Sequence, residues 1–272
     1  MWPKRFSRNA VNKSLLDIAA FSPHIIKGSS AWLGHTPFAA WIIQEAKPEV
    51  FVELGTHCGH SYFAFCEAIQ RAQTETKCWA VDTWRGDAHS GTYTDEVFSD
   101  VREHNEEHYA NFSKLLRTTF DEATTEFQNR SIDILHIDGF HTYEAARHDF
   151  DAWLPKVKRG GIVLLHDICV HEGDFGVWKL WDEIKMRYQN HMEFPHSYGL
   201  GVVQVGDGYR RQKQTWRPDD ATEREVLMRY FAALGLRQVE RYEIRELKRQ
   251  VDKEKTECAR LESALNIQGG IL

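Results

Sequence analysis

Near-continuous apolar runs alternate with segments of helical spacing between residues 50 and 205. Short apolar runs of this kind are typical of parallel strands that are buried on both faces of a sheet. The alternation predicts an α/β fold with a doubly wound, mostly parallel sheet of the Rossmann-like class. The expected strands are residues 50–54, 77–81, 115–119, 132–137 and 162–165, and residues 192–196 and 200–205 are expected to form a final antiparallel pair. The expected helices are residues 61–72, 95–108, 121–128, 143–154 and 175–188.

Helical segments flank this region on both sides. Two helices are expected before it, at residues 11–20 and 37–46, and Pro37 suits the first position of the second helix. The expected organisation is an N-terminal helical extension at 1–48, a central domain at 49–206, and a tail with a linker, a helix and a short coiled coil at 207–272.

The tail begins with a charged linker at 206–220, followed by an expected helix at 221–234 that ends at Gly235. Beyond it, apolar or small residues keep a three-four spacing that Glu254 interrupts once, which is typical of a short coiled coil. This seam predicts a homo-oligomer formed through the C-terminal helices, but a helix packed along its own subunit would show the same spacing. The closing glycines, 269–270, continue a helix poorly, so we expect a longer native chain that was cut here. The seam residues are Ile244, Leu247, Val251, Cys258, Leu261 and Leu265.

Composition excludes several classes of protein. The formal net charge of −6 argues against a nucleic-acid partner, because phosphate binding depends on clustered positive charge. Five scattered cysteines without a C-x-x-C pair indicate neither a zinc ribbon nor a disulfide framework. The N-terminus lacks the apolar region of a secretory signal, and no apolar stretch is long enough for a membrane span. These features predict a cytoplasmic protein with reduced thiols.

A glycine-punctuated turn joins the first expected strand to a helix within residues 49–61. Glycines let the backbone approach a ligand closely, and the helix start beyond them offers unpaired N–H groups. The spacing Glu-x-Gly-x-x-x-Gly differs from the dinucleotide fingerprint, which needs three glycines, so a pyrophosphate is not the favoured ligand. The residues expected to contact a small ligand here are Glu53, Gly55, Thr56, Gly59 and Ser61.

The next two expected strands also end in residues suited to a nucleoside. Asp82 ends the second strand, where an acid can hold both hydroxyls of a ribose. Trp84 could cover an adenine face, although a tryptophan after a strand is as often plain packing. Thr119 and Phe120, at the end of the third strand, are expected on the adenine side of the same pocket.

The fourth and fifth expected strands end in Asp138 and in the pair His166-Asp167, and His141 follows shortly after Asp138. Ligands of such sheets bind beyond the carboxyl ends of the strands, so these groups are expected around one cavity. Two converging carboxylates either bind a divalent cation or raise one pKa by repulsion. His141 could act as a general base, since an imidazole titrates near neutral pH. His141 and Asp167 could instead cap or pack the structure that follows each strand.

These strand-end motifs lie together in one central region, roughly residues 48–206. They are Glu53-Leu-Gly55-Thr-His-Cys-Gly59, Ala80-Val-Asp82-Thr-Trp84, His136-Ile-Asp138-Gly-Phe-His141-Thr-Tyr143-Glu144, and the later Asp149, Pro155, Gly160-Gly161 and His166-Asp167. In combination they resemble one branch of the class I S-adenosylmethionine-dependent methyltransferases, which includes macrolide-sugar O-methyltransferases and methyltransferase domains found with polysaccharide glycosyltransferases. The resemblance reaches neither the N-terminal helices nor the tail.

The resemblance implies that S-adenosylmethionine is the cofactor and that its methionine end faces Glu53. It also implies a magnesium ion held by Asp138 and by an acidic pair at positions 166 and 167, with His141 as the base. This chain has His166 where an acid is expected, and because magnesium prefers oxygen ligands, manganese would fit as well. The metal ligands expected here are Asp138, His166 and Asp167.

The function that the resemblance predicts is methyl transfer from S-adenosylmethionine to a sugar hydroxyl, on a polysaccharide or a glycosylated metabolite. Aromatic residues are expected either to stack on the sugar or to belong to the core or rim. Two alternatives stay open: a reductase that uses a nicotinamide dinucleotide, which the missing third glycine disfavours, and a catalytically silent module whose tail recruits a glycosyltransferase. The aromatic residues in question are Tyr93, Trp178 and Trp181.

Overall fold

A computed structural model of the chain describes residues 13–23, 30–206 and 216–269. Its centre is a seven-stranded sheet with the order β5-β2-β1-β6-β7-β9-β8. Strands β5, β2, β1, β6 and β7 are parallel, while β9 is antiparallel to both of its neighbours. The predicted doubly wound, mostly parallel sheet is therefore confirmed. The strands are β1 (Val50–Leu54), β2 (Lys77–Asp82), β5 (Ser113–Arg117), β6 (Ile132–Ile137), β7 (Val157–His166), β8 (His191–Phe194) and β9 (Leu200–Gln204).

Strands β5 and β7 differ most from their expected bounds, for local reasons. Strand β5 ends at Arg117 because Thr119 caps helix α5 (Phe120–Ala123), forming a reciprocal capping box with Glu122. Strand β7 begins at Val157, five residues earlier than expected, and its pairing with β6 is irregular near Ile132. The extra length carries the chain through Gly160-Gly161 before the regular apolar run.

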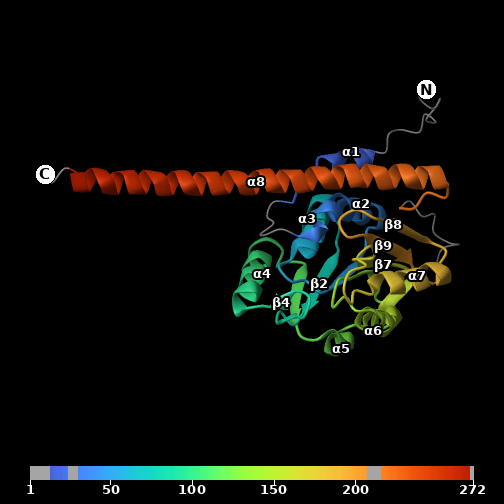
Figure 1. Cartoon of the computed structure of the whole chain (residues 1–272). Coiled ribbons are helices and arrows are strands. Elements are labelled where there is room, and N and C mark those ends of the chain that lie inside the picture. The colour runs from blue at the N-terminus through green and yellow to red at the C-terminus, as the bar shows by residue number, and fades with distance from the viewer. Residues whose placement is uncertain (1–12, 24–29, 207–215, 270–272) are drawn as a thin grey trace, which may run out of the picture.

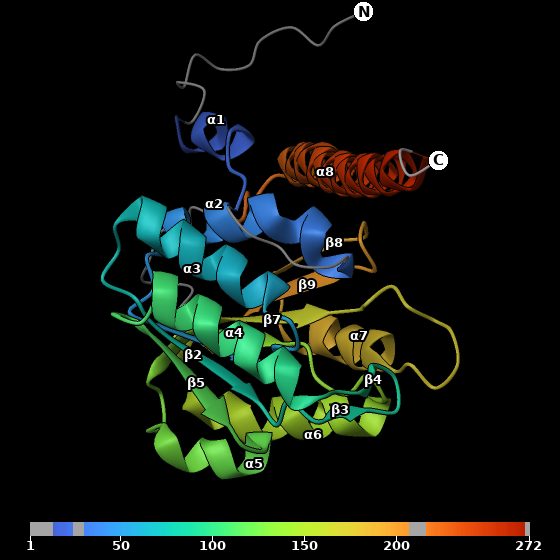
Figure 2. The ribbon, with the colours of Figure 1, turned by 90° about the vertical axis from the view of Figure 1, so that its left-hand side faces the viewer.

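Helices cover both faces of the sheet (Figure 2). On one face lie α2 (Thr36–Ala46), α3 (His60–Ala72) and α4 (Asp95–His108), and on the other lie α5, α6 (Tyr143–Trp153) and α7 (Val177–Arg187). Successive strand residues point to opposite faces, so Phe51 belongs to the first core and Val52 to the second. Short elements complete the domain: α1 (Lys13–Ala19), three 3-10 helices at Ala31–His35 (η1), Thr124–Glu126 (η2) and Leu154–Lys156 (η3), and a small hairpin of β3 (Gly86–Asp87) and β4 (Gly91–Thr92).

The tail is one continuous helix, α8 (Ala221–Gly269), which passes α1 and α2 and projects far beyond the domain (Figure 1). The prediction that a helix ends at Gly235 is wrong. A Cβ at Gly235 would lie 2.2 Å from the carbonyl oxygen of Gly34, so this glycine permits close packing of α8 on η1. Most of the expected linker, residues 207–215, lies outside the described residues.

The apolar seam of α8 lies on its projecting part. Ile244, Leu247, Val251 and Leu261 are between 46% and 60% exposed, so this segment does not pack along its own subunit. The coiled coil, and the homo-oligomer that it implies, stay predictions. Among the residues that the structure describes, no helix combines the length and apolar character that a membrane crossing requires.

Candidate active site

A cavity of about 650 Å³ opens beyond the carboxyl ends of β1, β2, β6 and β7. Three residues expected to contact a ligand, Glu53, Gly59 and Trp84, are not in its lining. The sheet thus brings most of the expected strand-end residues to one place, as parallel strands do. The expected residues that line it are Gly55, Thr56, Ser61, Asp82, Thr119, Phe120, Asp138, His141, His166 and Asp167.

The glycine turn after β1 is a tight loop, as expected. Gly55 has φ +86°, and a Cβ there would lie 2.0 Å from the carbonyl oxygen of Asp138. Only glycine can combine this backbone conformation with so close an approach. Gly59, with φ +84°, precedes α3 and packs on Phe63, so its role is to turn the chain into the helix.

Glu53 does not line the cavity, and its contact with a ligand stays a prediction. Its side chain is fully buried and accepts a hydrogen bond from His136 Nδ1, 2.9 Å away on the neighbouring strand β6. The indole N–H of Trp32 donates to His136 Nε2 at 3.1 Å, so the proton of a neutral His136 must be on Nδ1. Burial raises the pKa of the Glu53 carboxyl. Glu53 therefore positions Trp32 through His136, and Trp32 lines the cavity.

Asp82 braces the glycine loop from the end of β2. One carboxylate oxygen accepts hydrogen bonds from the N–H groups of Thr56 (2.9 Å) and His57 (2.8 Å), and the other accepts from Trp84 N–H (2.6 Å). Asp82 still lines the cavity, and its contact with a ribose stays a prediction.

Trp84 belongs to the core, in line with plain packing, the second of the two roles considered for it. The side chain is 1% exposed, with its ring 4.8 Å from that of Phe98. Its indole N–H donates to the carbonyl oxygen of His57 at 2.8 Å. The buried ring therefore supports the glycine loop from behind.

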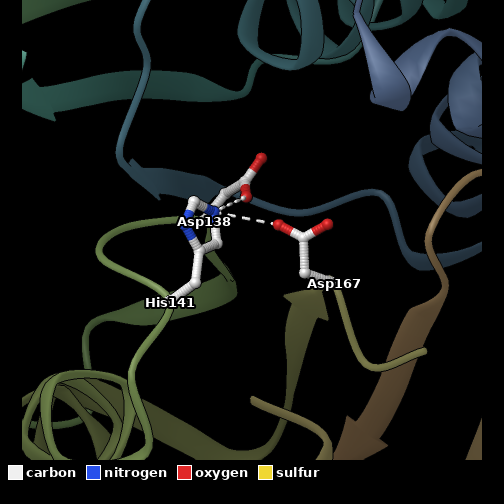
Figure 3. A group of neighbouring side chains, drawn as sticks. All are labelled: Asp138, His141 and Asp167. Atoms are coloured by element: carbon white, nitrogen blue, oxygen red, sulfur yellow. Dashed lines mark ion pairs between the residues drawn. The ribbon is translucent and has the colours of Figure 1, made fainter. Parts of the chain in front are cut away.

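Asp138, His141 and Asp167 point toward one another at the ends of β6 and β7 (Figure 3). His141 Nε2 lies 2.9 Å from Asp167 Oδ2 and 3.9 Å from Asp138 Oδ1. One ligand atom from each of the three residues lies within 4.8 Å of the others, a set that could hold a metal ion. Asp167 adopts a left-handed φ of 61°, a conformation that non-glycine residues take mainly where the surroundings require it.

His166 contacts both carboxylates of this cluster. Its Nδ1 lies 3.4 Å from both Asp138 Oδ1 and Asp167 Oδ1, while its Nε2 lies 3.1 Å from the carbonyl oxygen of Ser197. The triad that could hold a metal contains His141 in place of the expected His166. Since the side chain of His166 is only 3% exposed, we interpret it as a buried partner of the two carboxylates.

The paired charges shift each other's titration. Burial lowers the pKa of His141, but hydrogen bonds to Asp138 and Asp167 outweigh it and raise the pKa to about 9. Burial likewise lowers the pKa of His166, but the negative charge of Asp138 is the largest effect that outweighs it, and the pKa rises to about 10. Burial acts to raise the pKa of Asp138, yet these imidazoles hold it well below its usual range. Without a bound cation, both imidazoles are therefore positively charged at neutral pH.

Two residues at or beside the cavity carry no sequence signal. His89, at the tip of the β3–β4 hairpin, contacts His141 but is not in the cavity lining, and Tyr198, 60% exposed, lines the cavity. Of the aromatic residues expected near an acceptor, only Tyr93 lines the cavity. Trp181 is 2% exposed and packs against Gly201 in the core.

Comparisons with known proteins agree with this geometry. Residues 52–168 match the family model described as a methyltransferase domain. An uncharacterized protein, y4gI of Sinorhizobium fredii (strain NBRC 101917 / NGR234), is 42% identical over 199 residues, which cover 73% of this chain and 22% of the relative. The chain thus spans about a fifth of the length of that relative.

Solved methyltransferase structures are similar at low identity. The SAH-bound methyltransferase PaMTH1 of Podospora anserina has a TM-score of 0.48 and 14% identity, covering 72% of this chain and 89% of that one. The O-methyltransferase TomG of Streptomyces achromogenes, in complex with SAM, has a TM-score of 0.48 and 11% identity, covering 72% of this chain and 98% of that one. At these values the similarity identifies neither an acceptor nor a reaction. Residues 52–168 of this chain are therefore similar to a methyltransferase domain, and the sheet that contains them is Rossmann-like.

Proposed function

We propose that this chain transfers a methyl group from S-adenosylmethionine to a hydroxyl of a sugar-type acceptor. The observation that carries the proposal is the convergence of Asp138, His141 and Asp167 in the same cavity as the glycine loop. The similarity of residues 52–168 to a methyltransferase domain supports S-adenosylmethionine as the methyl donor. A cation site beside a histidine is suited to removing the proton of a weakly acidic hydroxyl.

The cofactor would bind along the carboxyl ends of β1, β2 and β5. Gly55, Thr56 and Ser61 would surround its methionine end, where the loop backbone and the start of α3 can approach closely. Asp82 would bind the ribose with lone pairs that its three backbone contacts leave unused. The adenine would lie near Thr119 and Phe120, both of which line the cavity.

Asp138 and Asp167 would hold a divalent cation through their carboxylate oxygens, which suit magnesium and manganese. His141 would stay uncoordinated, so that its Nε2 is available as the base. When bound, such a cation would lower the pKa of the acceptor hydroxyl and help to orient it. His166, in place of the acid implied by the resemblance, makes the site less negative by adding a positive charge beside Asp138 and Asp167.

His141 would accept the proton of the acceptor hydroxyl on Nε2, the nitrogen that faces the carboxylates. The oxygen forms a bond to the methyl carbon as the carbon–sulfur bond breaks, and S-adenosylhomocysteine leaves with the electron pair. Asp138 and Asp167 would hold the imidazolium that forms. Trp32, packed over the site by His136, would help to exclude water.

The cavity has two aromatic side chains that are suited to pack on a sugar ring. Tyr93 and Tyr198 both line it, and neither ring is buried in the core. Aromatic faces with polar edges can pack on a ring while hydrogen-bonding its hydroxyls. The exposed seam of α8 suits a separate role in binding a glycosyltransferase or a second copy of the chain.

Incubation with labelled S-adenosylmethionine and a panel of glycans tests the proposal. We expect label in a glycan, loss of transfer with a chelator, and recovery on adding manganese or magnesium. A matched control is His148→Ala, which removes an exposed imidazole paired with Asp121 away from the cavity. Full transfer in the presence of a chelator would remove the cation from the mechanism, and no binding of S-adenosylmethionine at all would refute the proposed function.

A further inference from the structure

His89 contacts the active-site residue His141 from the turn between β3 and β4. The carboxylate of Asp87 accepts hydrogen bonds from the backbone N–H groups of His89 and Ser90, both at 2.8 Å. These bonds fix the turn, and they place an imidazole that is only 12% exposed beside His141. The position is therefore built by local structure.

Two hydrogen bonds join His89 to the site and to a second loop. Its Nδ1 lies 3.2 Å from Nδ1 of His141, and its Nε2 lies 2.8 Å from Oδ1 of Asp174. An ionised carboxylate only accepts, so His89 donates from Nε2 to Asp174. A neutral His89 then has a bare Nδ1, and His141 must donate from its own Nδ1. Asp174 thereby sets the tautomer of His89, and the bare nitrogen of His89 keeps a proton on Nδ1 of His141 in both the neutral and the charged state of that imidazole.

Ring stacking holds the same arrangement. The rings of His89 and His141 are 23° from parallel, and Phe175 lies nearly parallel to both, at 4.6 Å from His89 and 4.8 Å from His141. The backbone of this loop is also tied to His141, because Gly176 N–H donates to its carbonyl oxygen at 2.8 Å. The imidazole of His141 is therefore restrained by the ring stack and at Nδ1.

We propose that His89 and Asp174 are positioning residues for His141, keeping a proton on its Nδ1 and directing its Nε2 toward Asp138 and Asp167. This inference rests on the proposed function only for the use of Nε2 in methyl transfer. Partners that orient a functional imidazole in this way typically change activity or metal affinity by about 10- to 100-fold when they are removed. His89 and Asp174 touch no reacting atom in this scheme.

Nitrogen-detected NMR of the full chain, metal-free and at one fixed pH, tests the positioning directly. In the wild type we expect a proton on Nδ1 of His141 that exchanges slowly with water. His89→Phe keeps an aromatic ring for stacking on Phe175 but removes the acceptor, so this proton should exchange rapidly. His148→Phe is the matched control, since it removes an exposed imidazole whose carboxylate partner is also 2.8 Å away.

Kinetics give the second readout. We expect kcat to fall about 10- to 100-fold in His89→Phe and in Asp174→Leu, with an unchanged KM for S-adenosylmethionine. Because Asp174 is 69% exposed, we expect its substitution to leave the fold intact. Asp174→Leu therefore tests the inference even if His89→Phe does not fold. An unchanged Nδ1 proton together with wild-type kcat would overturn the inference. If the wild type transfers no methyl group, the proposed function fails while the NMR comparison still decides the positioning role.

Discussion

The carboxylate of Glu53 binds the imidazole of His136 at 2.9 Å in the interior of the protein, on neighbouring strands whose Cα atoms are in register. Both side chains are fully buried. An acid at the end of the first strand therefore serves to hold a histidine and, through it, Trp32. This contact gives Glu53 a supporting role in the interior, which is distinct from a direct contact with the cofactor.

Replacing Glu53 tests that role. Glu53→Leu leaves the N–H of His136 buried without an acceptor, so we expect the free energy of unfolding in urea to fall by about 1–3 kcal/mol. Glu53→Gln is the matched variant, because its amide oxygen can still accept, and it should lose less. If Glu53→Gln instead keeps full stability and loses binding of S-adenosylmethionine, Glu53 contacts the cofactor after all.

Removing the base should affect the chemical step. His141→Ala removes the group that takes the proton, and general-base catalysis contributes about 10²- to 10⁴-fold, so kcat should fall by that factor. The measurement is methyl transfer at saturating S-adenosylmethionine, with His148→Ala as the control. A variant that keeps wild-type kcat would exclude His141 as the base.

The charge cluster should make stability depend on pH. The folded pKa of His141, about 9, lies above its ordinary value of 6.5, so this group stabilises the fold fully below pH 6.5. The contribution is lost as pH rises to about 9, and it amounts to about 3 kcal/mol at 1.36 kcal/mol per pKa unit. The measurement is urea unfolding of chelator-treated protein, compared with His141→Gln. A difference between the two that is constant from pH 6 to pH 10 would contradict the ion pairing.

Replacing Gly235 with alanine tests the packing of α8 on η1, because the two possible results differ in the sign of the stability change. An ordinary glycine inside a helix would be improved by alanine, by roughly 0.5–1 kcal/mol. A Cβ at this position would approach Gly34 O to 2.2 Å, so we expect Gly235→Ala to destabilise the protein by about 1–3 kcal/mol. A thermal melt distinguishes the outcomes, and a higher Tm in the variant would show that α8 and η1 do not pack this closely.

The exposed seam of α8 predicts self-association. Each buried leucine or valine contributes about 1.5–3 kcal/mol, so Leu247→Lys with Val251→Lys should weaken a dimer at least about tenfold. Sedimentation over a range of concentrations measures it, and Lys253→Glu changes charge on the face away from the seam as a control. A wild type that stays monomeric at every concentration would exclude the second copy as the partner of this seam.

Sequence periodicity predicted the five parallel strands and the acids that follow them, because burial on both faces leaves a continuous apolar run. Asp82, Asp138 and Asp167 line one cavity for the same reason: parallel strands end at a common edge. The sequence did not show that Glu53 and Trp84, which stand among ligand-binding motifs, face inward. The direction of a side chain at a strand end depends on what packs against that face.

The order and type of the elements of the central sheet, the glycine loop and the identity of the strand-end residues were determined by the sequence alone, since each is encoded in adjacent positions. Only the tertiary structure decided which side chains meet. Trp32 and His136 are 104 residues apart, and His89 and Asp174 are 85 apart, yet each pair forms a hydrogen bond. Such contacts arise where separate loops and strands converge, and no local spacing records them, because they depend on the packing of the whole chain.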